Sequence, residues 1–464
     1  MTLHRAARYA FALAIVGLPA SARAQAFGLN EIGSCALARG FAVTSAPCDD
    51  GSSIYWNPGA IPRTSGFTAT AGVAAIAIDG GFTQDTTFVV HDLDVSTEWV
   101  PHVFVNYRPA AGRFERIAVG LGVYVPYGLT SQWKTDFPGR FAAQKASLHS
   151  IYVQPNVSFA ITDDWSVGVG PVMGFSSVEL VQGVDLSQQQ TPAGPTFGQL
   201  GIAKRTEFAR ATLKGDATAF GVNVGVHGKI GTSWEVGGRF LSSMYFKYDD
   251  ADATFEQVPT GLVLAANNPF GAPGNTPLDV VLAPSFASGG ALTAQKVKTQ
   301  IMHPAQAQVG LGYNGIENTT ISLDYAWVGW KSFKELPVDF QGDATDRVLL
   351  ENYNNTSALR LGVEHRYTSG AALRAGVAAT ASAAPDVTVT PLLPEQDRAY
   401  GSIGGRYPLT KSLTVDAAYS HIFTPGRRGR IDERTSLSQT AEQLNTGAYT
   451  LRANIFSISL KASL

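Results

Sequence analysis

The sequence predicts an all-β fold, namely a transmembrane antiparallel β-barrel of about fourteen strands with an N-terminal hatch that plugs its lumen. Three observations lead to this prediction: an export signal, long segments in which apolar and polar residues alternate, and connections that are alternately short and long. Charged residues make up 16% of the chain, below the ~25% of typical soluble domains. The formal net charge is −2, so nothing favours a nucleic-acid partner.

Residues 1–24 have the three parts of a secretory signal peptide. A basic start precedes an apolar run from Tyr9 to Leu18, and Ala22-Arg23-Ala24 forms a small-x-small cleavage site. The apolar run is shorter than the ~20 residues that a membrane-spanning helix needs. We therefore expect this segment to direct export and to be removed, and we expect no helical membrane span after it.

Residues 25–62 lack the alternation of a strand and are expected to form the hatch. They are rich in small residues and contain the tight-turn tripeptide Asn57-Pro58-Gly59. They also hold both cysteines of the chain, Cys35 and Cys48, and an exported segment favours a disulfide between them. Two free thiols are the alternative. Without nearby histidines the pair makes a poor zinc site, so we expect no metal and no cofactor.

Residues 63–464 are expected to form the barrel, because apolar and polar residues alternate along many segments. Clear examples are 151–159, 321–327, 357–367 and 413–423. A soluble sandwich would show alternation too, but with shorter strands and more frequent turns. The segments here reach the about 9–11 residues that a tilted strand needs to cross a bilayer. Aromatic residues also recur near their ends, as in the girdles of outer-membrane barrels.

The connections alternate between short turns and long loops, which is typical of outer-membrane barrels with periplasmic turns and extracellular loops. Two long loops stand out, at 181–216 and 250–297. The second contains apolar residues that include Leu262 and Leu264. Apolar residues on an exposed loop either pack against one another or meet a hydrophobic ligand, and the sequence leaves both readings open.

The chain resembles the FadL family of outer-membrane transporters, which includes proteins of the OmpP1, FadL and TodX type. The resemblance spans nearly the whole mature chain and rests on motifs near both ends. These motifs are Leu29-Asn30-Glu31, Leu37-Ala38-Arg39-Gly40, Asn57-Pro58, Tyr127-Gly128-Leu129 and Pro394-Glu395-Gln396-Asp397-Arg398. The resemblance implies a fourteen-stranded barrel closed by an N-terminal hatch, in agreement with the strand count above.

The resemblance also implies roles for particular residues. It places Phe27 against the ligand, makes Asn57, Pro58 and Gly59 a hatch turn, and puts an inward kink and a lateral opening at Val125-Pro126-Tyr127-Gly128. Proline supplies a physical cause for the kink, because it removes a hydrogen bond from the strand ladder. A plain strand end before a long loop is the alternative.

The resemblance further suggests which ligands to expect. Fatty-acid transporters of the family hold the ligand headgroup near an arginine and a lysine, and a rough alignment puts Gln182 and Pro337 at those positions. Gln182 is therefore a candidate substrate-binding residue, and the lack of a cation there favours a neutral ligand such as an aromatic hydrocarbon over a fatty acid.

The function that follows is passive uptake of hydrophobic compounds across the outer membrane of a Gram-negative cell. The expected steps are capture at Leu262 and Leu264, binding beside Phe27, movement of the hatch and release through the wall. Expected partners are the hydrophobic ligand, membrane lipid and lipopolysaccharide, and the barrel-assembly machinery, with the protein acting as a monomer. The alternative is a general diffusion porin for small polar solutes. An enzyme is not expected, because neither His227 nor His421 lies in a nucleophile motif.

Overall fold

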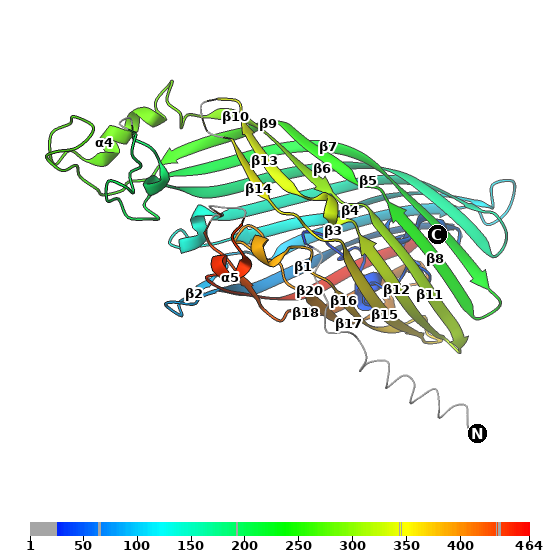
Figure 1. The fold of residues 1–464 in the computed structure, drawn as a ribbon. Helices are drawn as coiled ribbons and strands as arrows, with labels where there is room; N and C mark the ends of the chain where they lie inside the picture. Colours follow the sequence, from blue (N-terminus) through cyan, green and yellow to red (C-terminus); the bar gives the residue numbers. More distant parts are fainter. Residues whose placement is uncertain are drawn as a thin grey trace.

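The computed structural model describes residues 26–63, 66–191, 194–342, 344, 346–432, 434 and 438–464. Strands lie side by side along a long barrel, and loops that carry a short helix, α4, extend beyond one end (Figure 1). The predicted signal peptide, residues 1–24, lies outside the described residues. Within the described part of the chain, no helix is long and apolar enough to cross a membrane.

The strands and helices have the following bounds. The strands are β1 (Gly66–Gln84), β2 (Val90–Asp92), β3 (Glu98–Arg108), β4 (Ile117–Gln132), β5 (Lys145–Ala160), β6 (Trp165–Asp185), β7 (Glu207–Ile230), β8 (Trp234–Leu241), β9 (Met244–Gln257), β10 (Gln295–His303), β11 (Gln306–Ile316), β12 (Thr319–Val328), β13 (Glu335–Phe340), β14 (Arg347–Leu350), β15 (Thr356–Arg366), β16 (Ala372–Thr380), β17 (Arg398–Pro408), β18 (Leu413–Phe423), β19 (Arg427–Gly429) and β20 (Gly447–Ser463). The helices are α2 (Ser34–Ala38), α3 (Ser53–Trp56), α4 (Leu278–Leu282) and α5 (Ala441–Leu444), and the 3-10 turns are η1 (Pro58–Arg63), η2 (Pro138–Phe141), η3 (Leu186–Gln188), η4 (Ala283–Phe286), η5 (Trp330–Ser332) and η6 (Asp386–Thr388).

The wall is a closed antiparallel barrel of fourteen strands, as the sequence predicted. Four of the fourteen are interrupted and count as two elements each: β8 with β9, β10 with β11, β12 with β13, and β14 with β15. The barrel closes where β1 pairs with β20, from Thr68 opposite Ser463 to Gln84 opposite Gly447. Because the first and last strands of the barrel pair with each other, the sheet has no unpaired edge strand, as a sheet in a membrane requires.

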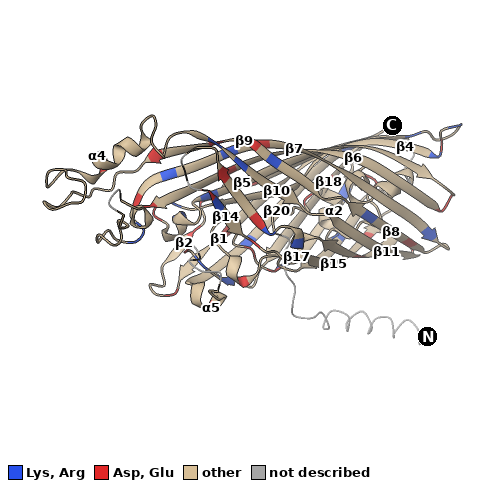
Figure 2. Cartoon of the chain, turned by 45° about the horizontal axis from the view of Figure 1, so that its top comes forward, with Lys and Arg blue, Asp and Glu red and all other residues tan. Residues whose placement is uncertain are grey.

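The alternation of the sequence becomes an apolar outer face and a polar inner face. Along β6, for example, Val167, Val169 and Phe175 are exposed on the outside, whereas Ser166 and Ser176 are buried. Outward apolar side chains suit contact with lipid. Charged residues of both signs lie on the strands toward the end that carries α4 (Figure 2). They form ion pairs there, such as Lys296 with Asp252 at 2.8 Å.

The lumen is occupied by residues 26–62, here called the hatch. Almost every residue of this segment is buried, including the whole of α2 and α3. The helix α2 packs against β16, β17 and β18, and the turn η1 packs against β5, β6 and β7 on another part of the wall. The hatch therefore contacts strands from widely separated parts of the barrel.

The strands run further into the two long loops than the alternation indicated. The segment 181–216 was expected to be a loop, but β6 continues to Asp185 and β7 begins at Glu207. The segment 250–297 similarly begins with the end of β9 and ends with the start of β10. The expectation was wrong at these positions because the strands continue beyond the belt of apolar side chains that faces lipid. Past this belt a strand carries polar residues on its outer face, so polar residues there do not indicate a loop.

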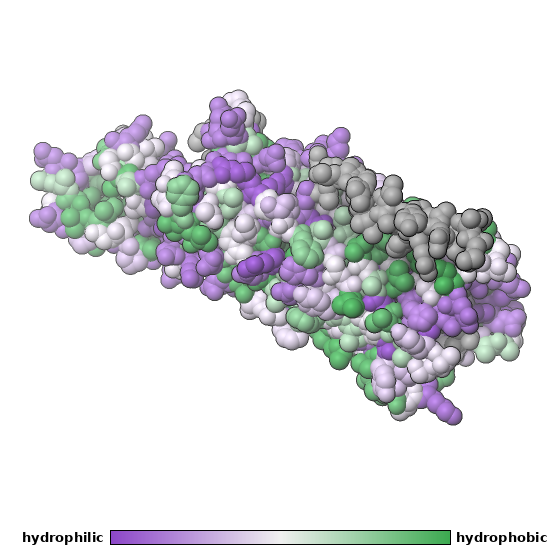
Figure 3. Space-filling view, turned by 90° about the horizontal axis from the view of Figure 1, so that it is seen from below, coloured by the Kyte–Doolittle hydropathy of each residue, from purple (hydrophilic) through white to green (hydrophobic). Residues whose placement is uncertain are grey.

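The loops that remain pack together at the same end of the barrel. A small hydrophobic cluster joins residues of the loop after β6, of the start of β7 and of the loop after β9. Its buried members are Leu186, Phe197, Phe208, Ala209, Leu264, Leu278 and Leu282. Hydrophobic residues are visible among hydrophilic ones at the loop-bearing end, on the left of Figure 3. We call the cluster of these seven buried residues and the side chains packed against it the loop cluster.

Candidate transport path

The wall of the barrel is interrupted between β3 and β4. These two strands pair only from Val103 opposite Val123 to Tyr107 opposite Val119. Beyond that point β3 continues back to Glu98, where it pairs with β1 alone, and β4 continues to Gln132, where it pairs with β5 alone. Residues 98–102 of β3 and 125–131 of β4 are thus not paired with each other, and we call the space between them the wall gap.

Two prolines account for the gap. Pro126 lies in a register shift of β4 between Tyr124 and Tyr127, as expected for a proline at a bulge. Pro101 lies in the facing part of β3. Neither can donate a ladder hydrogen bond. The sequence prediction had identified the kink at Val125 to Gly128 but not Pro101, because only the pairing shows that the two prolines face the same opening.

The N-terminal end of the hatch takes the place of the missing strand partner. Gly28 forms an isolated bridge with Tyr127. The Leu29 amide donates to the Pro126 carbonyl at 2.9 Å, and the Gly128 amide donates to the Phe27 carbonyl at 3.0 Å. The kinked part of β4 is thereby tied to the hatch rather than to β3.

A cavity of about 160 Å³ lies behind the wall gap. We call it the gap cavity. Its apolar lining residues are Ile76, Ile78, Leu93, Val100, Val125, Leu129, Leu393, Ile422 and Leu451. Trp99, 66% exposed on the wall, and the buried Glu31 of the hatch both line it. The gap cavity therefore reaches from the outer surface of the wall to the hatch.

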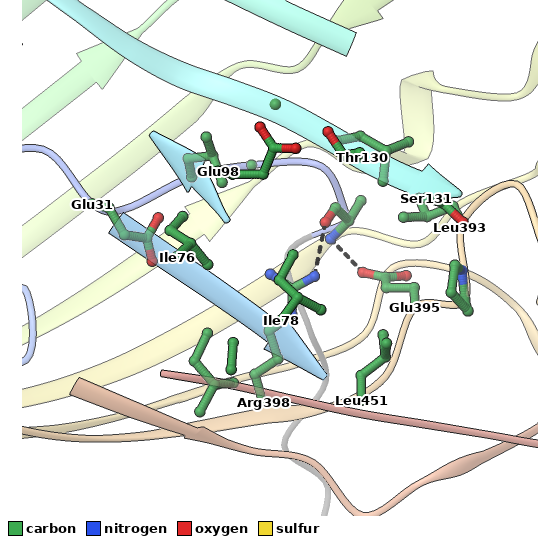
Figure 4. A pocket seen from close by; sticks show the side chains of 18 of the residues that line it. Glu31, Ile76, Ile78, Glu98, Thr130, Ser131, Leu393, Glu395, Arg398 and Leu451 are labelled. Carbon is green, nitrogen blue, oxygen red and sulfur yellow. Dashed lines mark hydrogen bonds between the residues drawn. The ribbon is translucent and has the colours of Figure 1, made fainter. Parts of the chain in front are cut away.

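A loop inside the barrel closes the polar side of the gap cavity. Residues 381–397, which connect β16 to β17, fold inward, and their Glu395 side chain is fully buried. The Glu395 carboxylate accepts a hydrogen bond from the Ala26 amide, and the Arg398 guanidinium donates to the Ala26 carbonyl (Figure 4). The carboxylate also accepts from the amides of Ala383 and Ala384. Burial raises the pKa of Glu395, although the hydrogen bonds from these amides act to lower it.

Phe27 lies on the other side of the N-terminal segment, in a cluster of aromatic rings. Its ring centroid is 4.6 Å from that of Trp330, 5.7 Å from Phe333 and 5.9 Å from Tyr127. The side chain is only 5% exposed. Phe27 therefore anchors the N-terminal segment, of which Ala26, Gly28 and Leu29 line the gap cavity.

A second cavity, of about 190 Å³, lies in the lumen nearer the loop-bearing end. We call it the mouth cavity. It is lined by Leu180, Val184, Leu213, Phe255, Val338, Phe340, Leu349 and Leu392, together with the polar residues Gln182, Lys145 and Arg347. Leu392 lines the mouth cavity and its neighbour Leu393 lines the gap cavity. The inward loop thus separates the two cavities.

The structure places the remaining candidate binding residues as follows. Gln182 lines the mouth cavity and donates its amide to the Phe141 carbonyl. Leu264 is buried inside the loop cluster, and Leu262 packs against it. Val263, between them, is 60% exposed. Of the two readings of this apolar loop, mutual packing therefore accounts for Leu262 and Leu264.

The turn Asn57-Pro58-Gly59 is wedged against β6 and β7. The Asn57 amide donates to the Thr44 carbonyl of the hatch at 2.7 Å and to the Val226 carbonyl of β7 at 3.0 Å. A Cβ atom on Gly59 would lie 2.7 Å from the Gly225 carbonyl oxygen. Glycine at this position thus allows the backbone of the hatch to approach the backbone of β7 closely.

Ion pairs fix the other side of the hatch. Asp49 accepts from both Arg406 of β17 and Lys461 of β20, the latter at 3.1 Å. Arg406 and Arg374 also pair with Asp416 of β18. Burial opposes ionisation of Asp49, but the hydrogen bonds and charge of Arg406 and the charge of Lys461 hold its pKa well below the usual range.

A disulfide joins Cys35 to Cys48 within the hatch, with their Cα atoms 6.2 Å apart. The bridge connects α2 to the segment that carries Asp49. Asp50 lies beside the two sulfur atoms. A bridged pair offers no thiolate to a metal, so this group is not a metal site.

The comparisons with known proteins agree with this architecture. The family model described as Outer membrane protein transport protein (OMPP1/FadL/TodX) matches residues 15–463. The long-chain fatty acid transport protein of Escherichia coli K12 is 25% identical over 443 residues, which cover 91% of this chain and 93% of that protein.

Two solved structures share the fold. The crystal structure of a Pseudomonas aeruginosa FadL homologue is similar with a TM-score of 0.77 and 21% identity, covering 95% of this chain and 100% of the other. The Pseudomonas putida toluene transporter TodX is similar with a TM-score of 0.67 and 14% identity, covering 95% and 100%. The family match spans almost the whole chain, and its members are transporters rather than enzymes. The chain belongs to the OMPP1/FadL/TodX family of outer membrane transport proteins.

Proposed function

We propose that the protein takes up hydrophobic compounds passively and releases them sideways through the wall gap. The observation that carries the proposal is the gap cavity, which has apolar walls and reaches from the exposed Trp99 to the buried hatch. The proteins similar to this chain are described as transporters of long-chain fatty acids and of toluene. Both compound classes are mostly apolar, as is the lining of the cavity.

The proposed path has three steps. Exposed apolar residues of the loop segment, such as Val263 and Val280, first hold the compound near the mouth of the barrel. It then occupies the mouth cavity beside Gln182. Finally the N-terminal segment around Phe27 and the inward loop at Leu392 and Leu393 move aside and admit the compound to the gap cavity. The compound leaves this cavity between β3 and β4. A shift of the turn Asn57-Pro58-Gly59 would accompany this movement.

The alternative function, a general porin, fits the lumen less well. A porin needs an open, water-filled channel lined by charged side chains. Here the inward charges contact the hatch instead. The Arg239 guanidinium lies 4.0 Å from the centre of the Tyr55 ring, and Arg360 donates to Asn30 at 3.0 Å.

Two further partners belong to the proposal. The outward residues Phe456, Ile458 and Leu460 of β20 are each about half exposed, and an alternating apolar last strand suits recognition by the barrel-assembly machinery. The ion pairs on the outer face near the loops, such as Lys296 with Asp252, suit contact with lipopolysaccharide headgroups.

Filling the gap cavity tests the proposed path. Val100 of β3 lines the cavity and is 4% exposed, so a Val100→Trp side chain would occupy the space behind the wall gap. We expect uptake of radiolabelled toluene or oleate to fall to the background of cells that lack the protein. The measurement uses Gram-negative cells in which this chain is the only transporter of its family.

The matched control is Val222→Trp, on the outer face of β7, where the side chain is 37% exposed. A tryptophan there meets lipid and is expected to leave uptake unchanged. If Val100→Trp assembled in the outer membrane and took up both compounds like the wild type, lateral release through the gap cavity would be refuted.

A further inference from the structure

Gln396 lines the gap cavity and carries an amide without a hydrogen-bond partner among the described residues. The residue is 1% exposed. Neither its amide nitrogen nor its amide oxygen has a hydrogen-bond partner among the described residues. Leaving a buried polar group unpaired costs about 1–3 kcal/mol, so two such atoms on one side chain call for an explanation.

Two neighbouring polar groups of the same cavity differ from Gln396, because protein atoms already satisfy them. The Glu395 carboxylate accepts from three backbone amides, those of Ala26, Ala383 and Ala384. The Ser131 hydroxyl donates to the Pro391 carbonyl at 2.7 Å. The Gln396 amide is thus available to a ligand without breaking a protein hydrogen bond.

The charges around the cavity do not favour an anionic ligand. Glu31, Glu98 and Glu395 line it together with Arg398 (Figure 4) and Arg452. Arg452 is paired with Asp79 on the outer face. Arg398 interacts with both Glu31 and Glu395, and its guanidinium also donates to the Ala26 carbonyl. A carboxylate brought into this apolar space would meet these acidic groups at low dielectric.

We propose that Gln396 selects neutral compounds that carry a hydroxyl group on an apolar body, such as phenols and alcohols. A hydroxyl both donates and accepts, so it can satisfy the oxygen and the nitrogen of one amide. A hydrocarbon would leave the amide unpaired, and a carboxylate could accept from its nitrogen but not donate to its oxygen. The inference rests on the proposed function and narrows its substrate class.

The size of the cavity suits one aromatic ring or a comparable length of alkyl chain. Its volume is about 160 Å³, similar to the about 150 Å³ apolar cavity known to bind benzene. Three ring compounds that differ in a single substituent therefore test the inference: p-cresol with a hydroxyl, toluene with none, and p-toluate with a carboxylate.

The experiment measures equilibrium binding of the three compounds to the full mature protein in lipid nanodiscs, with empty nanodiscs subtracted. We expect the wild type to bind p-cresol about tenfold more tightly than toluene, as one to two net hydrogen bonds would give, and to bind p-toluate more weakly than p-cresol. In Gln396→Leu the preference for p-cresol over toluene should fall to about twofold or less, with toluene binding retained.

Gln300→Leu is the matched control, because Gln300 is exposed on the outer face of β10; it should keep the wild-type preference. Should Gln396→Leu not assemble, Gln396→Met has the same expected result. An equal preference in wild type and variant overturns the role of Gln396, while toluene binding still supports the proposed function. Failure of all three compounds to bind the wild type would instead count against the proposed function itself.

Discussion

Replacing Asp49 with asparagine is expected to weaken the docking of the hatch by about 3 kcal/mol, the lower end of the range for breaking a buried ion pair. Asp49 pairs with Arg406 and Lys461, whose side chains are 8% and 11% exposed, while its own is 29% exposed. The substitution leaves both cations buried without their shared carboxylate. Local opening of the hatch, measured by hydrogen exchange of its amides, should therefore become more frequent.

The effect of Asp49→Asn should also depend on pH. The pKa of Asp49 is lowered in the folded protein, so its ionised form stabilises the docked hatch at neutral pH. This contribution is complete above the unfolded pKa of about 3.9 and is lost as the pH falls toward the lower folded value. The difference in hatch opening between wild type and variant should thus shrink below about pH 4.

Asp79→Asn is the matched control for this prediction. Asp79 pairs with Arg452 on the outer face of the barrel, where the two side chains are 66% and 69% exposed. An exposed pair contributes at most about 1 kcal/mol, so hatch exchange should stay near that of the wild type. Equal hatch opening in both variants would show that Asp49 does not hold the hatch.

Replacing Phe27 with alanine is expected to release the N-terminal segment from β4. The ring is 5% exposed and packs against Tyr127, Trp330 and Phe333. Truncating a buried phenylalanine costs about 3–5 kcal/mol. Only a few backbone contacts would then hold the segment, including the Leu29 amide on the Pro126 carbonyl at 2.9 Å. Exchange of the Leu29 and Gly128 amides should accelerate strongly.

Phe456→Ala provides the comparison, because Phe456 faces outward on β20 and is 57% exposed. Its loss should leave the exchange of Leu29 and Gly128 unchanged. If Phe27→Ala exchanged these two amides as slowly as the wild type, the aromatic cluster could not be the anchor of the N-terminal segment.

The wall of the barrel was predictable from the sequence because alternation is a local property. The segment 413–423 alternates in the sequence and forms β18 at the same residues. Residues 207–216 were harder, since polar side chains such as Lys214 and Asp216 face outward there without ending the strand. Alternation indicates a strand only where one face meets lipid or a packed core.

The features that form the proposed transport path were predictable only in part. Pro126 marked the kink in β4, and the hatch could be recognised by its lack of alternation. The partners of these features depend on contacts distant in sequence: Pro101 across the wall gap, and Glu395, which binds Ala26 from 369 positions away. In the sequence Gln396 is recognisable only as part of the motif Pro394-Glu395-Gln396-Asp397-Arg398. Its role follows from burial without a partner, which no sequence pattern reveals.

The structure gives Gly59 a role that the sequence did not predict. In the sequence it is predicted only as part of the tight turn Asn57-Pro58-Gly59. In the structure its φ is not positive, and the missing Cβ instead makes room for the Gly225 carbonyl. Asn57 of the same turn donates a hydrogen bond to β7, so the hatch packs closely against the wall at this point.

The conductance of the purified protein in planar lipid bilayers tests the central claim most directly. If the hatch closes the lumen and hydrophobic compounds leave through the wall gap, the protein should insert without a steady ionic current. A large, steady, ohmic conductance of the wild-type protein would contradict this account, because it would show an open aqueous channel through the lumen.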